Sequence, residues 1–267
     1  MIIDAHIHCS GDEKVDDVLQ ALDWAAVDKA IVLAPFLSGN YTLHDGASLR
    51  AANQYLARLI ADHTDRLIGF AVINPSLDHA SEDLCHAHDL GLPGLKMVPA
   101  GWYPYDDCAH RIYETASRLK IPILFHSGIF IDGKSGRFCR PSFYEAIRDY
   151  PDLRVTLAHL GWPWPDEANA VGLIDLINGV PPDKSQFRFD ISFGAPPVYR
   201  LEVLRKAIAV LTPELLQFGS DVFLPCSGKL IKSRIDDVSE LLERLDIDKH
   251  SRERIMGGTA AAWLGIS

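Results

Sequence analysis

The sequence lacks the features that mark several common classes of protein. Its five cysteines are odd in number and scattered, and none forms the CxxC pair of a zinc knuckle or a redox site. A disulfide framework is therefore not expected. No apolar run is long enough to span a bilayer, and no basic segment with an apolar signal core precedes the first apolar stretch. We expect a cytoplasmic protein whose thiols are reduced.

Positive charge is also scarce. The chain has 26 Lys and Arg against 36 Asp and Glu, a formal net charge of −10. Nucleic acids and anionic membranes attract basic surfaces, so we expect neither as a partner. A glycine-rich phosphate turn is missing after the first apolar stretch, where His6 to Gly11 stands instead. This absence disfavours an open, doubly wound nucleotide-binding sheet.

What is present is a regular alternation of strand-like and helix-like segments. Apolar strands are predicted at 1–8, 29–35, 66–75, 94–99, 121–126, 153–159, 187–192 and 215–221. Helical patterns are predicted at 15–26, 49–62, 80–90, 107–119, 142–150, 166–177, 198–211, 231–245 and 259–264. Nearly continuous apolar strands are typical of a parallel sheet covered by helices. Eight such units in 267 residues predict an α/β fold, a (β/α)₈ TIM barrel that forms a single domain over 1–267.

Two histidines end the first predicted strand. Because side chains at positions i and i+2 of a strand project from one face, His6 and His8 should present both imidazoles to the same side. Two neutral imidazoles at this spacing make half of a zinc site. An HxH motif is also common by chance, so the prediction depends on further ligands elsewhere in the chain.

Further polar side chains stand at the ends of later predicted strands. They are Lys96, His126, His159, Asp190 and Asp221. A polar residue that closes an apolar strand is costly unless it is paired or bound to a ligand. Because catalytic residues of TIM barrels gather at the carboxyl ends of the strands, we expect these groups to meet.

Three of these later residues, His126, His159 and Asp221, have a structural interpretation besides the functional one. His126 is either a metal ligand or a hydrogen-bonded core histidine. His159 is either a general acid or base beside the metal or a residue that supports a ligand. Asp221 is either a metal contact that transfers protons or the cap of the next helix.

Lys96 has three interpretations, because a lysine in an apolar strand can pair with a carboxylate, become carboxylated and bridge two metals, or bind a substrate anion. We favour the first or the last. Arg137 and Arg140, in the long loop after the fifth strand, are candidates to hold a substrate carboxylate, although loop arginines are also commonly solvated.

Aromatic residues are concentrated in the loops that follow the strands, among them Trp102 and Trp162. At the mouth of a barrel they suit a flat small-molecule substrate. The alternatives are a hydrophobic lid or a subunit contact, which would make the protein a homo-oligomer.

The motifs in their order resemble those of the amidohydrolase-related metal-dependent hydrolases, in the branch that includes aminocarboxymuconate semialdehyde decarboxylase. The shared segments are DAHIH (4–8), GLKMVP (94–99), PILFHSG (122–128), RPSFYEAIRDYPDLRVTLAHLGWPW (140–164), FGSD (218–221) and MGGTAAAWLGI (256–266). The resemblance covers nearly the whole chain. It departs at Thr259, where the family often has Asn.

The resemblance implies one divalent metal, usually zinc, held by His6, His8, His126 and Asp221. It also implies that His159 moves protons beside the metal, with Asp221 as the second candidate for that role. A second metal bridged by a carboxylated Lys96 is the alternative known from the wider superfamily.

The resemblance and the chemistry of zinc together predict a hydrolase that uses a zinc-activated water on a small carbonyl substrate such as an amide, a lactone or another ester. The alternative is a non-oxidative, metal-dependent decarboxylase of an aromatic or unsaturated carboxylic acid. A barrel that only binds a ligand is a third interpretation, which the filled ligand positions disfavour.

Overall fold

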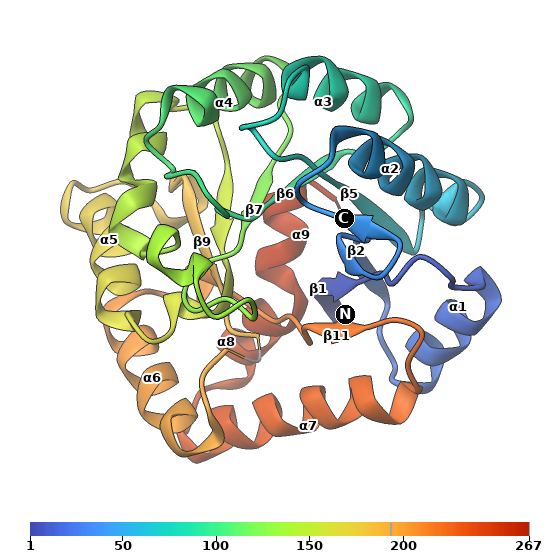
Figure 1. The fold of residues 1–267 in the computed structure, drawn as a ribbon. Helices are drawn as coiled ribbons and strands as arrows, with labels where there is room; N and C mark the ends of the chain where they lie inside the picture. The colour runs from blue at the N-terminus through green and yellow to red at the C-terminus, as the bar shows by residue number, and fades with distance from the viewer. Residues whose placement is uncertain (193, 267) are drawn as a thin grey trace.

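In the computed structural model, which describes residues 1–192 and 194–266, the strands form a curled nine-stranded sheet in which every paired neighbour is parallel (Figure 1). Its strands are β1 (Ile3–His8), β2 (Lys29–Leu33), β5 (Leu67–Val72), β6 (Gly94–Met97), β7 (Ile123–Phe125), β8 (Val155–Leu157), β9 (Phe187–Asp190), β10 (Leu216–Gln217) and β11 (Val222–Phe223). Their order is β10-β9-β8-β7-β6-β5-β2-β1-β11. A separate antiparallel pair consists of β3 (Leu37–Ser38) and β4 (Tyr41–Thr42).

The segment that contains β10 and β11 closes the barrel. β10 pairs with β9, and β11 pairs with β1. Between them, the Ala5 N–H donates to the Phe218 carbonyl at 3.0 Å and the Asp221 N–H donates to the His6 carbonyl at 2.8 Å. One continuous strand was predicted at 215–221. It is two short strands, because Asp221 has a φ of +54°, which is incompatible with an extended backbone.

Helices surround the sheet, except that α9 lies in the middle of the ring as seen in Figure 1. They are α1 (Val15–Trp24), α2 (Gly46–Ile60), α3 (Ala80–Asp89), α4 (Asp107–Leu119), α5 (Pro165–Ile177), α6 (Pro197–Val210), α7 (Gly228–Arg244), α8 (Lys249–Glu253) and α9 (Thr259–Leu264). Short 3₁₀ segments are η1 (Ser135–Phe138), η2 (Pro141–Asp149), η3 (Ala158–Gly161), η4 (Pro182–Lys184) and η5 (Pro213–Leu215), and η6 (Arg254–Gly258) is a π-helix. The predicted single-domain (β/α)₈ barrel is confirmed.

The structure differs from the predicted elements in a few places. The α-helix expected at 142–150 is the 3₁₀ helix η2, which begins at Pro141. The β3–β4 pair was not predicted, because strands of two residues are too short to show an alternating pattern. The helical turns of α8 and η6 were also missed. In the described residues, no helix is both long and apolar enough to cross a membrane.

Alternating strand residues face opposite sides of the sheet. In the neighbouring strands β6, β7 and β8, Leu95, Ile123 and Val155 are in register and belong to the large core that also takes in buried side chains of the surrounding helices. At the amino-terminal end of the barrel, Trp263 of α9 packs with its ring centroid 5.7 Å from that of Phe70. The carboxyl end of the barrel is therefore the end left for a site.

Candidate metal centre

Three donor atoms converge at the closing corner of the barrel. The Nε2 atoms of His6 and His8, both at the end of β1, lie 3.1 Å apart. The Oδ1 atom of Asp221, between β10 and β11, lies 3.1 Å from His8 Nε2 and 3.5 Å from His6 Nε2. The predicted projection of both imidazoles to one side is confirmed by this geometry.

The spacing of these atoms fits a divalent cation. Ligand atoms about 2.0–2.1 Å from a tetrahedral metal lie about 3.3 Å from one another, close to the three separations observed. Imidazole nitrogen and carboxylate oxygen are the donor types that such ions prefer in proteins. These three residues are therefore the ones that would hold the metal.

The protonation states also suit metal binding. Burial lowers the pKa of His6 and of His8, so both rings are neutral and can offer a lone pair. Burial alone would raise the pKa of Asp221, but the adjacent imidazoles of His6 and His159 and the hydrogen bond with His8 hold it below its ordinary value. The carboxylate is therefore ionised.

Asp221 is held in place by its neighbours along the chain. The preceding N–H, that of Ser220, donates to Asp4 Oδ1 at 2.9 Å. Gly219 lies so close to β1 that a Cβ there would stand 2.7 Å from the Cβ of His6. The FGSD turn thus needs a glycine at this position to bring the carboxylate against the two histidines.

Asp190, at the end of β9, fixes the orientation of His6. Its Oδ2 accepts a hydrogen bond from His6 Nδ1–H at 2.6 Å, which assigns the lone pair of the ring to Nε2. Oδ2 also accepts from the hydroxyl of Ser192 at 3.0 Å, and Oδ1 accepts from the Ser192 N–H at 2.5 Å. Burial raises the pKa of Asp190 to about 6, against the opposing effects of His159 and Ser192.

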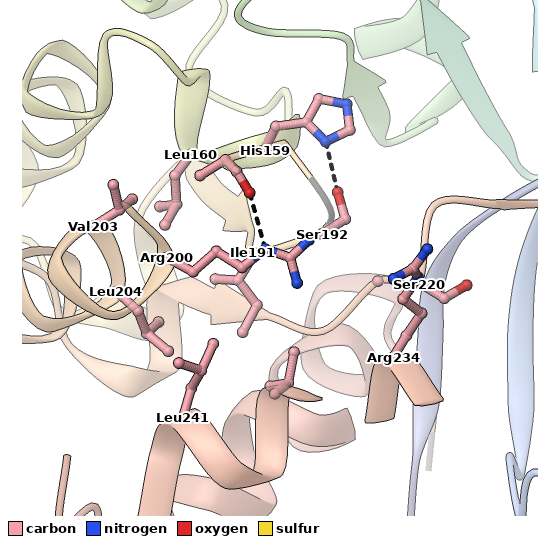
Figure 2. A pocket seen from close by; sticks show the side chains of 13 residues that line it. His159, Leu160, Ile191, Ser192, Arg200, Val203, Leu204, Ser220, Arg234 and Leu241 are labelled. Carbon is pink, nitrogen blue, oxygen red and sulfur yellow. Dashed lines mark hydrogen bonds between the residues drawn. The ribbon is translucent and has the colours of Figure 1, made fainter. Parts of the chain in front are cut away.

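The same network reaches His159. Its Nδ1–H donates to the Ser192 hydroxyl at 2.7 Å, as Figure 2 shows, so Nε2 is the ring nitrogen left for another partner. The ring stacks on His6 with centroids 5.3 Å apart. Burial lowers the pKa of His159 to about 4. Its φ of +61° is an unusual backbone conformation of the kind often found at functional sites.

His126, at the end of β7, lies on the other side of His159, with ring centroids 5.1 Å apart. Its Nε2–H donates to the Ile129 carbonyl at 2.8 Å, which leaves the lone pair on Nδ1. Burial lowers the pKa of the ring, so it is neutral. It is not part of the tight group formed by His6, His8 and Asp221, and its role as a ligand stays a prediction.

Lys96 of β6 is buried beside the donor atoms, with Nζ 3.1 Å from His6 Nε2. Burial lowers its pKa to about 8, although the carboxylates of Asp221 and Asp190 oppose this shift. Of its three interpretations, pairing with these buried acids and binding of a substrate anion both agree with this position.

A cavity opens above these groups at the carboxyl end of the barrel, with about 780 Å³ of space including its mouth. Its polar lining consists of His8, Lys96, His126, His159 and Asp221. Its apolar lining consists of Phe36, Leu37, Ile129, Phe130, Ile131 and Phe223. The ring of Phe223 stacks on that of His8 with centroids 4.5 Å apart. A mostly apolar chamber with a polar floor therefore surrounds the donor atoms.

Four residues that the sequence suggested for substrate binding do not line this cavity. Trp102 is 2% exposed and lies in the hydrophobic core. Trp162 packs near Tyr199, with centroids 6.2 Å apart. The Arg137 guanidinium lies over the ring of the adjacent Phe138. Arg140 forms an ion pair with Glu167 of α5. Of the predicted substrate-binding residues, the structure brings Lys96 alone to the cavity.

The residues that support the donor atoms were not predicted from the sequence. Asp190 was noted at a strand end but given no role, and Ser192 was not considered. The sequence does contain a signal for them, because Asp190 and Ser192 are two residues apart at the end of a buried strand, as His6 and His8 are. Asp4, the first residue of the DAHIH motif, was likewise given no role.

The model of the amidohydrolase family matches residues 3–266. The chain belongs to the amidohydrolase family. A search of curated proteins found no match.

Solved structures share the fold at low identity. A 5-carboxyvanillate decarboxylase from Sphingomonas paucimobilis is 17% identical, with a TM-score of 0.69 over 100% of this chain and 99% of that one. A 5-carboxyvanillate decarboxylase from Novosphingobium aromaticivorans, solved with manganese and a nitrobenzoic acid, is 14% identical, with a TM-score of 0.70 over 100% and 96%. A protein from Acinetobacter baumannii named as a probable 2-pyrone-4,6-dicarboxylic acid hydrolase is 17% identical, with a TM-score of 0.65 over 99% of each chain. This amidohydrolase thus resembles both decarboxylases and a hydrolase in fold.

Proposed function

We propose that this amidohydrolase removes a carboxyl group from a small aromatic or unsaturated carboxylic acid, with a divalent metal and without oxidation. The observation that carries the proposal is the composition of the cavity. Six apolar side chains form its walls, and one lysine, Lys96, lies in its polar floor. Among the solved structures of this fold, two named above are decarboxylases of an aromatic acid.

The cavity suits a substrate with one carboxylate and an apolar body. Lys96 Nζ lies on the floor next to the donor atoms, where it would attract the carboxylate. The rings of Phe36, Phe130 and Phe223 would pack against the remainder of the molecule. Apolar walls also exclude water, and loss of CO₂ from a carboxylate is favoured where the localised charge is poorly hydrated.

We propose zinc as the metal, held by His6, His8 and Asp221 with His126 as a further ligand through Nδ1. Two or three imidazoles and one carboxylate are a ligand set that zinc accepts readily. When bound, a divalent cation supplies positive charge that holds the carboxylate and stabilises negative charge developing on the substrate.

The reaction breaks the bond between the carboxyl carbon and its neighbour, leaves the electron pair on that neighbour, and adds one proton there. We assign this proton transfer to His159 Nε2, because Nδ1 is engaged with Ser192. Burial disfavours the imidazolium, but an anionic substrate next to the ring favours it. The proton comes from solvent, so one proton is consumed for each CO₂ released.

A screen of aromatic and unsaturated carboxylic acids with metal-loaded protein tests the proposal. CO₂ release is measured together with uptake of deuterium from D₂O at the carbon that carried the carboxyl group. Equal amounts of CO₂ and deuterated product are expected. Turnover of lactones or amides without CO₂ release would contradict the proposal.

A second candidate is hydrolysis of a small amide, lactone or ester. The observation that favours it is the neutral His159 ring, whose Nδ1–H is held by Ser192 so that Nε2 can accept a proton from an attacking water. Incorporation of ¹⁸O from labelled water into the product acid would identify this reaction. Decarboxylation leaves no water oxygen in its organic product.

A further inference from the structure

The polarity of the cavity at the metal centre changes with depth. Four of its polar side chains are buried, namely those of His8, Lys96, His126 and His159. Among the lining residues that the structure describes, those exposed to solvent are all apolar. They are Leu37, Ile129, Ile131 and Phe223, with exposed fractions from 39% to 81%. We call these four residues the apolar rim.

The apolar rim is assembled from three segments that are far apart in the sequence. Leu37 belongs to β3, in the hairpin that follows β2, and Phe223 belongs to β11. Ile129 and Ile131 belong to the loop after β7. Single exposed apolar side chains are common on protein surfaces, whereas apolar side chains gathered in one place mark a site for a ligand or a partner. The rim therefore indicates an occupant with an apolar surface.

The apolar rim is attached directly to residues of the metal centre. The Ile129 N–H donates to the Trp162 carbonyl at 3.0 Å, and the Ile129 carbonyl accepts from His126 Nε2–H at 2.8 Å. The ring of Phe223 stacks on that of His8. A molecule that is bound at the floor and is long enough to reach the mouth would therefore contact the rim.

The charged residue next to the rim has its partners elsewhere. Asp132 follows Ile131 in the chain but is not part of the cavity lining. Its carboxylate accepts from the Ser135 hydroxyl at 2.5 Å and from the N–H groups of Ser135 and Lys134 at 2.8 and 2.9 Å. In the described part of the lining, the polar end of a ligand therefore finds its partners at the floor, where Lys96 lies, and the apolar end finds them at the rim.

The size of the cavity agrees with a ligand that reaches from the floor to the mouth. The space is about 780 Å³ including the mouth. Pockets of about 300–1,000 Å³ ordinarily enclose ligands the size of a drug molecule, which are larger than one aromatic ring with a carboxylate. Each methylene group that moves from water to an apolar surface contributes about a fourfold gain in affinity. An apolar substituent that reaches the rim would therefore strengthen binding substantially.

We propose that the substrate is an amphipathic acid, in which an aromatic or unsaturated carboxylate carries an apolar substituent of several carbon atoms at the end remote from the carboxyl group. The carboxylate would lie at the floor beside Lys96, and the substituent would lie against the apolar rim. This inference rests on the proposed function for the position of the carboxylate, and it narrows the substrate to acids of this shape. The other occupant that such a rim would suit is a second copy of the chain.

Isothermal titration of the metal-loaded protein with benzoate and with series of 3-alkyl- and 4-alkylbenzoates tests the proposal, because binding is measured whether or not CO₂ is released. In at least one series the affinity should rise with each added methylene, and the butyl compound should bind at least about tenfold more tightly than benzoate. An affinity that stays level or falls along both series would overturn this inference and leave the proposed function intact. Failure of every acid to bind, benzoate included, would contradict the proposed function together with this inference.

Variants of the rim locate the substituent. Ile131→Ser should reduce the preference for the butyl compound over benzoate by about threefold, and a double variant with Ile129→Ser should reduce it by about tenfold. Ile131 is 81% exposed, so its replacement should leave the fold intact.

Ile177→Ser on α5 is the matched control, because Ile177 is 68% exposed and lies outside the cavity lining. This variant should keep the full preference. An undiminished preference in the double variant would overturn the proposal. A change from dimer to monomer in light scattering would then assign the rim to a contact between two copies of the chain.

Discussion

The metal centre and the cavity behind His159, which Arg200 and Arg234 line, are built in different ways. The metal centre takes its donors from strand ends, and buried hydrogen bonds to Asp190 and Asp4 hold them within a few ångströms of one another. The cavity behind His159 takes its charges from long side chains on α6 and α7. A short side chain at a strand end has little freedom of position, whereas a long side chain on a helix can adopt several positions.

The two regions also differ in the charges of their side chains. At the metal centre, lone pairs and an ionised carboxylate converge, and a cation relieves their mutual repulsion. The cavity behind His159 instead presents two guanidinium groups, those of Arg200 and Arg234, each within 4 Å of the Asp237 carboxylate. Changes to these two arginines should therefore leave metal binding intact.

The largest effect is expected from Asp221→Ala. Loss of the one anionic donor should lower metal affinity by more than about 100-fold and reduce turnover to background. Metal content after purification without chelator is measured by mass spectrometry. The control is Arg200→Met, which should retain the full metal content, and an Asp221→Ala protein that also did so would remove Asp221 from the ligand set.

His159→Gln should lower kcat by about 10²–10⁴-fold, because it removes the group assigned to proton transfer. Metal content should stay at the wild-type level, since the tight donor group does not require this ring. Parallel metal analysis and kinetics check both points. Loss of metal in this variant would make His159 a ligand instead.

Asp190→Asn should lower metal affinity by about 10–100-fold, because the amide no longer fixes the Nδ1–H tautomer of His6. Ser192→Ala is the matched control. It breaks the link to His159 and leaves the His6 hydrogen bond in place, so it should lower kcat and spare the metal. Equal metal affinity in the two variants would show that Asp190 does not act through His6.

His126→Ala should lower both bound metal and turnover, by roughly tenfold if Nδ1 is a ligand outside the tight group. Metal titration of the apoprotein measures the change. Full metal content in this variant would remove His126 from the ligand set, and its hydrogen bond to Ile129 would then be its main role.

The smallest effect is expected from metal removal on the stability of the fold. A chelator should lower the Tm of the protein, because a metal bound to the folded state stabilises it. Melting curves with and without chelator measure the change, and an unchanged Tm would contradict a metal bound to the folded state.

Much of the barrel was predictable from the sequence because its signals are local. Continuous apolar strands separated by helices determine the number of β/α units, and strand parity puts His6 and His8 on one side. The polar residues at the strand ends could be predicted as donors, because the carboxyl ends of parallel strands meet at one edge of the sheet.

Other features depend on contacts between distant segments. The position of Trp102 in the core reflects how the loop after β6 packs, which its local sequence does not determine. The link from His6 through Asp190 and Ser192 to His159 joins three strands and depends on their register. Arg200 and Arg234 belong to helices whose relative rotation decides whether they face one cavity or solvent.

The decisive measurement is an X-ray structure of the metal-loaded protein, with anomalous data collected on both sides of the zinc absorption edge. One strong anomalous peak is expected about 2.0–2.2 Å from His6 Nε2, His8 Nε2 and Asp221 Oδ1. No peak at that position, or a peak held by residues other than these three, would contradict the assignment of these ligands.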